Sequence, residues 1–96
     1  QRSAEAVPEQ WALEQNYPNP FNSETGIAFA VPQADRVTLK IYDIHGSEVA
    51  TLMQEVPVAA GRYQVRWNPT KLASGAYLCV LQTPSSRLLR KMVLLR

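Results

Sequence analysis

Apolar residues recur at every second position along most of this sequence, and no window of eleven or more residues shows the 3.6-residue period of a helix. Alternation of this kind is typical of strands that bury one face and leave the other face in water. The pattern therefore predicts an all-β protein, with strands at residues 25–31, 36–42, 48–55, 61–67, 76–82 and 87–95.

The six predicted strands differ in how regular their alternation is. Residues 61–67 alternate cleanly, whereas residues 76–82 are apolar on both faces, which is typical of a central strand. The alternation breaks within residues 48–55, so we expect a bulge or an edge strand there, and residues 87–95 are mixed on both faces. The apolar faces predict a core that is formed by Ile27, Phe29, Val37, Leu39, Ile41, Tyr63, Val65, Trp67, Tyr77 and Leu81.

Short segments that contain proline or glycine separate the predicted strands. Proline fixes φ and glycine allows positive φ, so each of these segments favours a tight turn. Short strands that are separated by turns at regular intervals predict an antiparallel β-sandwich. A seventh, short strand is expected around Leu13.

The first residues of the chain have a different composition. Residues 1–12 are mostly small and polar, show no apolar period, and are predicted to be the tail of a linker from a preceding domain. The sandwich is then expected to occupy residues 13–96, because a chain of 96 residues can form one modest core. The sequence begins at Gln1 and has no basic segment leading into an apolar run, so we expect a fragment without an export peptide.

Charge and cysteine content argue against several classes of function. The formal net charge of +2 is far below the strong basicity that favours nucleic-acid binding. No run of eighteen apolar residues occurs, so no membrane-spanning helix is predicted. The single cysteine, Cys79, cannot form an internal disulfide and offers no metal-cluster pattern.

Residues 13–22, with the sequence LEQNYPNPFN, lack the alternation seen elsewhere. Pro18 and Pro20 have no backbone N–H and favour extended backbone, so we expect a polyproline-like strap that turns into the first long strand. Tyr17 and Phe21 are expected to pack against the end of the sandwich. A loop that binds a ligand is the alternative interpretation of this segment.

Four ordered blocks of the sequence resemble the type A C-terminal sorting domain of the type IX secretion system, at residues 13–32, 37–52, 61–81 and 90–96. A likeness that extends from residue 13 to residue 96 is far more specific than one short motif. The resemblance implies an immunoglobulin-like sandwich of about seven strands at the end of a larger exported cargo protein. It also implies recognition by an outer-membrane translocon, removal by a sortase-like peptidase, and a secreted or cell-surface location.

The motifs of that family can be carried over position by position. The proline-rich block falls on Asn16, Tyr17, Pro18, Asn19, Pro20 and Phe21, and the glycine–tyrosine block falls on Gly75 and Tyr77. The resemblance implies that the translocon reads the last block, which comprises Lys91, Met92, Val93, Leu94, Leu95 and Arg96. Arg96 stands where lysine is usual in the family, and a planar guanidinium is not equivalent to a compact ammonium at a shaped site.

Side chains able to do catalytic chemistry are few and scattered. His45 is the only histidine and lies in a predicted turn, in which Asp43 is expected to bond the backbone ahead of Gly46. Cys79 is flanked by apolar residues and is expected to be a small buried side chain. We therefore predict no enzyme activity, no cofactor and no metal site.

Two alternatives to a sorting role stay open on the residues alone. In a carbohydrate-binding module of a secreted hydrolase, Trp11 or Trp67 would stack on sugar, although the strand period places Trp67 on the inner face. The other alternative is a structural interaction module similar to a hook-capping sandwich. The basic residues near the end of the sequence have two interpretations: a partner binds this segment as a strand at a sheet edge, or the charges protect an ordinary edge strand against aggregation. These residues are Arg87, Arg90, Lys91 and Arg96.

Overall fold

The computed structural model describes residues 7–96, and this part of the chain contains seven strands and no helix. The bounds are β1 Ala12–Leu13, β2 Thr25–Val31, β3 Asp35–Tyr42, β4 Glu48–Val58, β5 Gly61–Trp67, β6 Gly75–Gln82 and β7 Arg87–Leu94. Each of the six long strands starts within one residue of its predicted start, and the expected short strand near Leu13 is confirmed.

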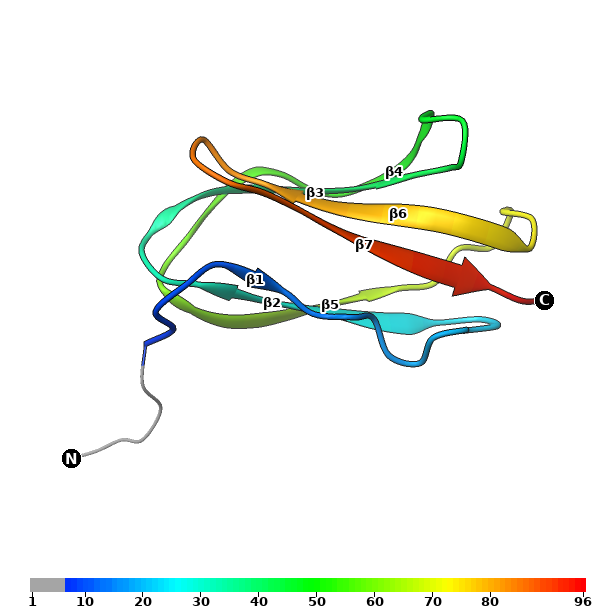
Figure 1. Ribbon diagram of the computed structural model, residues 1–96, viewed down its shortest axis with the longest axis horizontal. Coiled ribbons are helices and arrows are strands. Elements are labelled where there is room, and N and C mark those ends of the chain that lie inside the picture. The colour runs from blue at the N-terminus through cyan, green and yellow to red at the C-terminus, as the bar shows by residue number, and fades with distance from the viewer. Residues whose placement is uncertain (1–6) are drawn as a thin grey trace.

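The strands form two antiparallel sheets that face each other (Figure 1). One sheet has the order β1-β2-β5, and the other has the order β4-β3-β6-β7. This arrangement confirms the predicted all-β class and the immunoglobulin-like sandwich. It also confirms a central strand at residues 76–82, because β6 pairs with β3 on one side and with β7 on the other.

The broken alternation of residues 48–55 corresponds to an irregular edge strand. β4 lies at the edge of the four-stranded sheet, and its pairing with β3 shifts in register at three places. At one irregular position Glu55 has a φ of 49°, which is uncommon for a residue other than glycine, and its N–H donates to the Thr38 hydroxyl at 3.1 Å. β4 continues to Val58, past its predicted end, because Val56 and Val58 still pair with β3.

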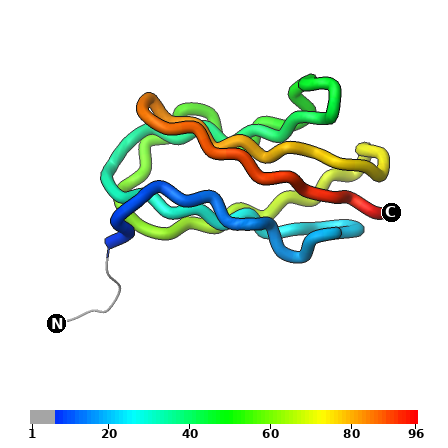
Figure 2. The backbone as a smooth tube through the Cα atoms, viewed as in Figure 1, coloured from blue at the N-terminus to red at the C-terminus, as the bar shows by residue number. Residues whose placement is uncertain are grey.

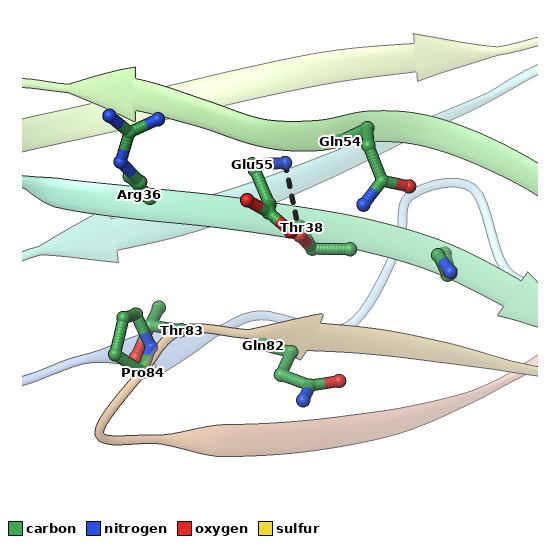
Figure 3. A pocket seen from close by; sticks show the side chains of 8 residues that line it. Arg36, Thr38, Gln54, Glu55, Gln82, Thr83 and Pro84 are labelled. Atoms are coloured by element: carbon green, nitrogen blue, oxygen red, sulfur yellow. Dashed lines mark hydrogen bonds between the residues drawn. The ribbon is translucent and has the colours of Figure 1, made fainter.

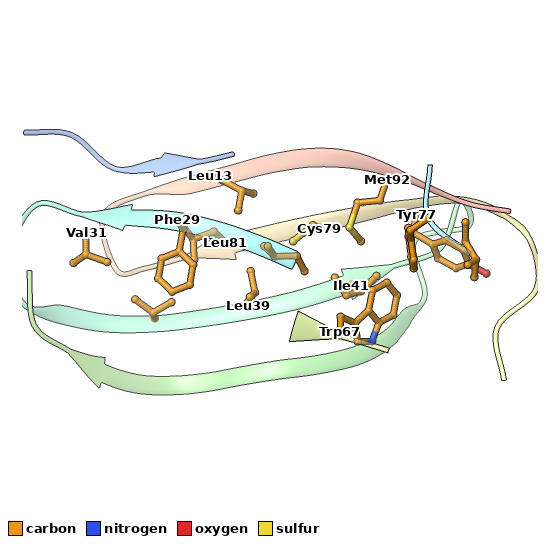
Figure 4. Packing of buried hydrophobic residues seen from close by; sticks show 14 residues of the cluster. Leu13, Phe29, Val31, Leu39, Ile41, Trp67, Tyr77, Cys79, Leu81 and Met92 are labelled. Atoms are coloured by element: carbon orange, nitrogen blue, oxygen red, sulfur yellow. The ribbon is translucent and has the colours of Figure 1, made fainter. Parts of the chain in front are cut away.

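The core lies between the sheets, where apolar side chains from both of them meet (Figure 4). Eight of the ten predicted core residues are buried, whereas Tyr63 and Val65 are half-buried. Both of these lie on β5, an edge strand that has a neighbouring strand on one side only. The prediction that Cys79 is buried is confirmed. The core also includes Leu13, Phe21, Val31, Met92 and Leu94.

The predicted linker is described only in part, since residues 1–6 lie outside the described residues. Within residues 7–12, Trp11 is half-buried and packs against the core, and Ala12 already belongs to β1. Pro8 is also buried, so packing begins before residue 13, and the domain boundary at that residue stays a prediction.

The edges of the two sheets meet on two opposite sides of the sandwich. On one side, β1 lies near β7, and residues 15–21, here called the strap, run from the edge of one sheet to the edge of the other (Figure 2). On the other side, β4 and β5 are the edge strands, and residues 59–60 connect them. We call these the closed side and the open side.

Candidate functional site

The strap is fixed to the start of β2 by a set of buried polar groups. Asn16 is only 3% exposed, and its side-chain amide donates to the Thr25 hydroxyl at 2.9 Å and to the Pro18 carbonyl at 3.1 Å. The Thr25 hydroxyl donates to the same carbonyl at 2.9 Å. Backbone hydrogen bonds run in both directions between Tyr17 and Gly26. Because buried polar groups that bond one another are costly to separate, the strap is held in one conformation.

The two aromatic residues of the strap differ in their burial. Phe21 is 2% exposed, and its ring centroid lies 5.9 Å from that of Trp67, as predicted for a residue that closes the end of the sandwich. Tyr17 is 83% exposed, so the prediction that its ring packs on the sandwich is wrong. Its backbone is held by Gly26, and this pairing fixes the chain without burying the ring.

The path of the strap also differs from the predicted polyproline-like run. Residues 18–20 form bends, and the Tyr17–Pro18 and Asn19–Pro20 peptide bonds are both cis. The bends carry the chain from β2 in one sheet to β7 in the other, where Phe21 forms a parallel bridge with Leu94. Hydrogen bonds to both sheets, rather than the local preference of proline, therefore set the path of the strap.

The strap covers the outer edge of β7 with hydrogen bonds. The N–H of Phe21 donates to the Val93 carbonyl at 3.0 Å, and the N–H of Leu95 donates to the Phe21 carbonyl at 2.9 Å. The Asn19 side chain accepts a hydrogen bond from the N–H of Val93 at 3.0 Å. The backbone of β7 is therefore already paired where an added strand would have to bind.

Two long side chains extend this cover along the strand. The Gln15 side chain donates to the Lys91 carbonyl at 2.7 Å, and the Arg90 guanidinium donates to the Leu13 carbonyl at 2.7 Å. The second bond joins β7 to β1 and so links the edges of the two sheets. Contacts from residues 13–21 thus follow the chain from Arg90, in β7, to Leu95, just past the end of that strand.

The alternation of β7 divides the block that was predicted to be read by the translocon. Met92 and Leu94 are fully buried and belong to the core. Lys91 and Val93 alternate with these residues and point to the opposite face of the sheet, where Lys91 is exposed and Val93 is half-buried. Leu95, which follows the end of β7, is exposed. The structure therefore leaves only part of the block available to a partner.

Arg96, the last residue of the sequence, is bonded to the loop before β6. Its N–H donates to the Ser74 hydroxyl at 2.8 Å, and its guanidinium donates to the carbonyls of Leu72, at 2.8 Å, and Pro69. A planar fork of donors suits this bonding to two carbonyls. Lys91, by contrast, is exposed on the outer face, so these basic residues do not form one group.

The glycine–tyrosine block forms a local hydrogen-bonded arrangement that occurs twice in the structure. Gly75 begins β6 with a φ of 154°, and the Tyr77 hydroxyl donates at 2.6 Å to the carbonyl four positions earlier. Gly61 and Tyr63 repeat this arrangement at the start of β5, with a φ of 153° and a bond of 2.6 Å. Only Gly75 and Tyr77 were predicted to form such a block, although the same spacing of glycine and tyrosine at Gly61 and Tyr63 is a signal for both.

A polar hollow of about 400 Å³ lies on the outer face of the four-stranded sheet (Figure 3). Its lining consists of Arg36, Thr38, Lys40, Gln54, Glu55, Gln82, Thr83 and Pro84. The hollow lies over the bulge at Glu55, whose hydrogen bond to the Thr38 hydroxyl crosses its floor. These residues offer hydrogen-bond donors and acceptors, but among the described lining there is no histidine, cysteine or aromatic ring.

The positions of the aromatic rings do not favour carbohydrate binding. Trp67 is buried in the core, and Trp11 is half-buried against it. Tyr63 is half-buried and stacks on Phe29, with ring centroids 5.4 Å apart. Stacking on sugar needs an accessible flat platform of rings, and within residues 7–96 only Tyr17 is an exposed aromatic residue.

The reactive side chains lie where the sequence predicts them. The Asp43 carboxylate accepts hydrogen bonds from the N–H groups of His45 and Ser47, which confirms the turn and leaves His45 exposed. Burial raises the pKa of the Cys79 thiol to about 12, so the nucleophilic thiolate is scarce at neutral pH. Residues 7–96 contain no group of three or more histidine, cysteine or acidic residues that could hold a metal ion. No helix in this part of the chain has the length and apolarity needed to cross a membrane.

The fold places this protein in the class of immunoglobulin-like sandwiches. One edge of the sandwich, at β7, is covered by hydrogen bonds from the strap. The chain belongs to the family described as the secretion system C-terminal sorting domain, whose model matches residues 15–95. It is a sorting domain for type IX secretion, which confirms the resemblance seen in the sequence, and domains of this family are not catalytic. Membership implies a type IX secretion system, a preceding cargo domain, and secretion to the cell surface or beyond it. No curated protein matches the sequence.

Proposed function

We propose that this domain directs the preceding cargo domain across the outer membrane by binding the outer-membrane translocon. In this proposal, the block from Lys91 to Arg96 supplies side chains that the translocon contacts, and the strap holds that block in place. A sortase-like peptidase then acts on the exported protein, which stays attached to the cell surface or is released. The domain itself performs no chemical step, in keeping with a buried Cys79 and a His45 held in an exposed turn.

The strap and the last block are joined into one unit, and this contact supports the proposal. Phe21 of the strap exchanges backbone hydrogen bonds with Val93 and Leu95 of the last block, and the family match covers all three residues. Its buried ring also contributes to the core that holds this unit together. Side chains of the block that the core does not use, such as Lys91, are exposed to a partner.

The test is secretion of a fluorescent protein that carries an export signal at its start and this domain at its end. In a host with the type IX system, the fusion should reach the medium or the cell surface. In the same host without a functional translocon, it should accumulate in the periplasm. Retention in the periplasm of the intact host would show that the proposed function is wrong.

Point variants are better suited to this test than deletions. Deleting residues 91–96 would remove Met92 and Leu94 from the core, so a loss of export could reflect unfolding. The double variant Lys91→Ala with Arg96→Ala keeps both core residues and should lower export. A thermal melt of the same variant distinguishes lost recognition from lost structure, because Arg96 also bonds the loop before β6.

A further inference from the structure

The position of the last block restricts how a partner can read it in the folded domain. Its even-numbered apolar residues, Met92 and Leu94, are buried in the core. Its backbone is paired with the strap on one edge and with β6 on the other. A partner that binds the folded domain must therefore contact side chains on the outer face of the sheet, where Lys91 is exposed.

Lys91 borders a second hollow, of about 280 Å³, that is mostly apolar. Its lining brings together the turn between β3 and β4, the start of β6 and the outer face of β7. The residues that line it are Asp43, Ile44, Ala76, Tyr77, Leu78 and Lys91.

Two apolar side chains at this hollow are exposed to solvent. Ile44 is 74% exposed in its turn, and Leu78 is 38% exposed on β6. The Asp43 carboxylate holds the turn by accepting two backbone N–H groups, so the backbone at Ile44 has a fixed position beside the sheet. Turn positions usually carry polar residues, so an isoleucine that is held exposed beside an exposed leucine forms an apolar surface that a partner can cover.

Lys91 adds a positive charge to this apolar surface. Both ion pairs found among residues 7–96 involve other residues, so no carboxylate of the described chain lies within salt-bridge distance of its ammonium. The acidic residue of the hollow, Asp43, uses its carboxylate to bond the turn. A complementary surface would place apolar groups against Ile44 and Leu78 and a carboxylate against Lys91.

We propose that Ile44, Leu78 and Lys91 form the surface on which the outer-membrane translocon docks, here called the sorting face. This inference rests on the proposed function and deepens it by naming the contact surface. The matching surface of the partner is apolar and carries an acidic group opposite Lys91. Ile44 and Leu78 lie outside the last sequence block, so the signal is a folded surface rather than a terminal peptide.

The experiment compares three variants of the sorting face with two matched controls in the secreted fluorescent fusion. Leu78→Ser is paired with Val56→Ser on β4, because these side chains are 38% and 37% exposed. Lys91→Glu is paired with Arg62→Glu on β5, an exposed cation of the other sheet. Ile44→Ser completes the set. Each sorting-face variant should lower export about tenfold, as expected when a central interface residue is lost, while the controls stay within about twofold of the parent.

Melting midpoints and export levels together test whether the sorting face is the docking surface. Thermal melting midpoints near that of the parent would show that the variants fold, and Ile44→Ser and Lys91→Glu still decide the matter if Leu78→Ser melts early. Export of both at the level of the controls would overturn the inference while leaving the proposed function intact. A parent fusion that is never exported would overturn both. A purified parent domain that dimerises, and that Ile44→Ser makes monomeric, would show that a second copy covers this face instead.

Discussion

The closed and open sides of the sandwich protect their strand edges in different ways. On the closed side, the strap bonds along β7 and places Phe21 in the core. On the open side, β4 is bulged and carries Glu55 with positive φ and Pro57, while β5 presents Arg62 and Arg66. Bulges, prolines and charged side chains all hinder the addition of another strand to an edge.

Covering an edge and distorting an edge differ in their effect on stability. The strap removes apolar surface from water and satisfies buried polar groups, so it contributes to the free energy of unfolding. The bulges and charges of the open side prevent pairing while burying little. Substitutions on the closed side should therefore destabilise the domain more than substitutions on the open side.

The largest effect is expected for Phe21→Ala on the closed side. It removes a ring that is 2% exposed and leaves a cavity beside Trp67, which should lower the free energy of unfolding by about 3–5 kcal/mol. Urea denaturation measures this change. Tyr17→Ala is the matched control, because its ring is 83% exposed and its loss should cost no more than about 0.5 kcal/mol. Equal losses for the two variants would contradict the structure of the strap.

A smaller loss is expected for Asn16→Ala. The substitution removes the amide that bonds the Thr25 hydroxyl and the Pro18 carbonyl in a buried site, which should cost about 1–3 kcal/mol. Denaturation gives the size of the loss, and the labelling rate of Cys79 by a thiol reagent should rise because the core opens more often. Asn22→Ala, at an exposed position, should leave both measurements near those of the parent.

On the open side, Glu55→Gly should change stability only slightly and in the opposite direction. Glycine adopts the φ of 49° without strain and keeps the N–H that donates to the Thr38 hydroxyl. The loss of backbone strain is partly offset by the greater conformational freedom of glycine in the unfolded chain. The free energy of unfolding should therefore rise by less than about 1 kcal/mol. A clear loss of stability in denaturation would show that the Glu55 side chain has a role in the bulge.

The smallest effect is expected for the ion pairs that join the open-side strands to their neighbours, Glu24–Arg66 at 2.6 Å and Lys40–Glu48 at 3.1 Å. The hydrogen bond and charge of Arg66 lower the pKa of Glu24, and hydrogen bonds from Thr51 and Lys40 lower the pKa of Glu48. Because each folded-state pKa lies below the unfolded value of about 4.3, the stabilisation is present above that pH and is lost as the pH falls through the folded pKa. The urea midpoint should therefore decline slightly in acid, and Arg66→Gln should flatten part of that decline. Parallel pH profiles for the parent and the variant would contradict this assignment.

The strands could be predicted from the sequence because alternation is a local property. β5, for example, has its predicted bounds, since the face on which each of its residues lies depends only on position along the strand. The path of the strap could not be predicted, because its bonds join residues far apart in the chain. Gln15 bonds Lys91 across 76 positions, and no local propensity specifies that contact.

The candidate site could be predicted in part. The resemblance to the family assigned Lys91 and Met92 to one recognition block. In the structure, the alternation of β7 places them on opposite faces of the sheet, so Lys91 is exposed and Met92 is buried. Ile44 was not singled out, because its hollow exists only when the turn, β6 and β7 come together. Its signal in the sequence is an apolar residue within the otherwise polar turn DIHGSE.

The contact between the strap and β7 also bears on when the domain can fold during protein synthesis. A ribosome adds residues in order, so the strap emerges long before the residues of β7 are made. Until then the nascent chain lacks Met92 and Leu94 for its core, and Phe21 has no strand edge to bond. Pairings between distant segments also form slowly. The domain therefore completes its fold only after its last strand has been translated, and until then the nascent chain carries it as an incompletely folded segment.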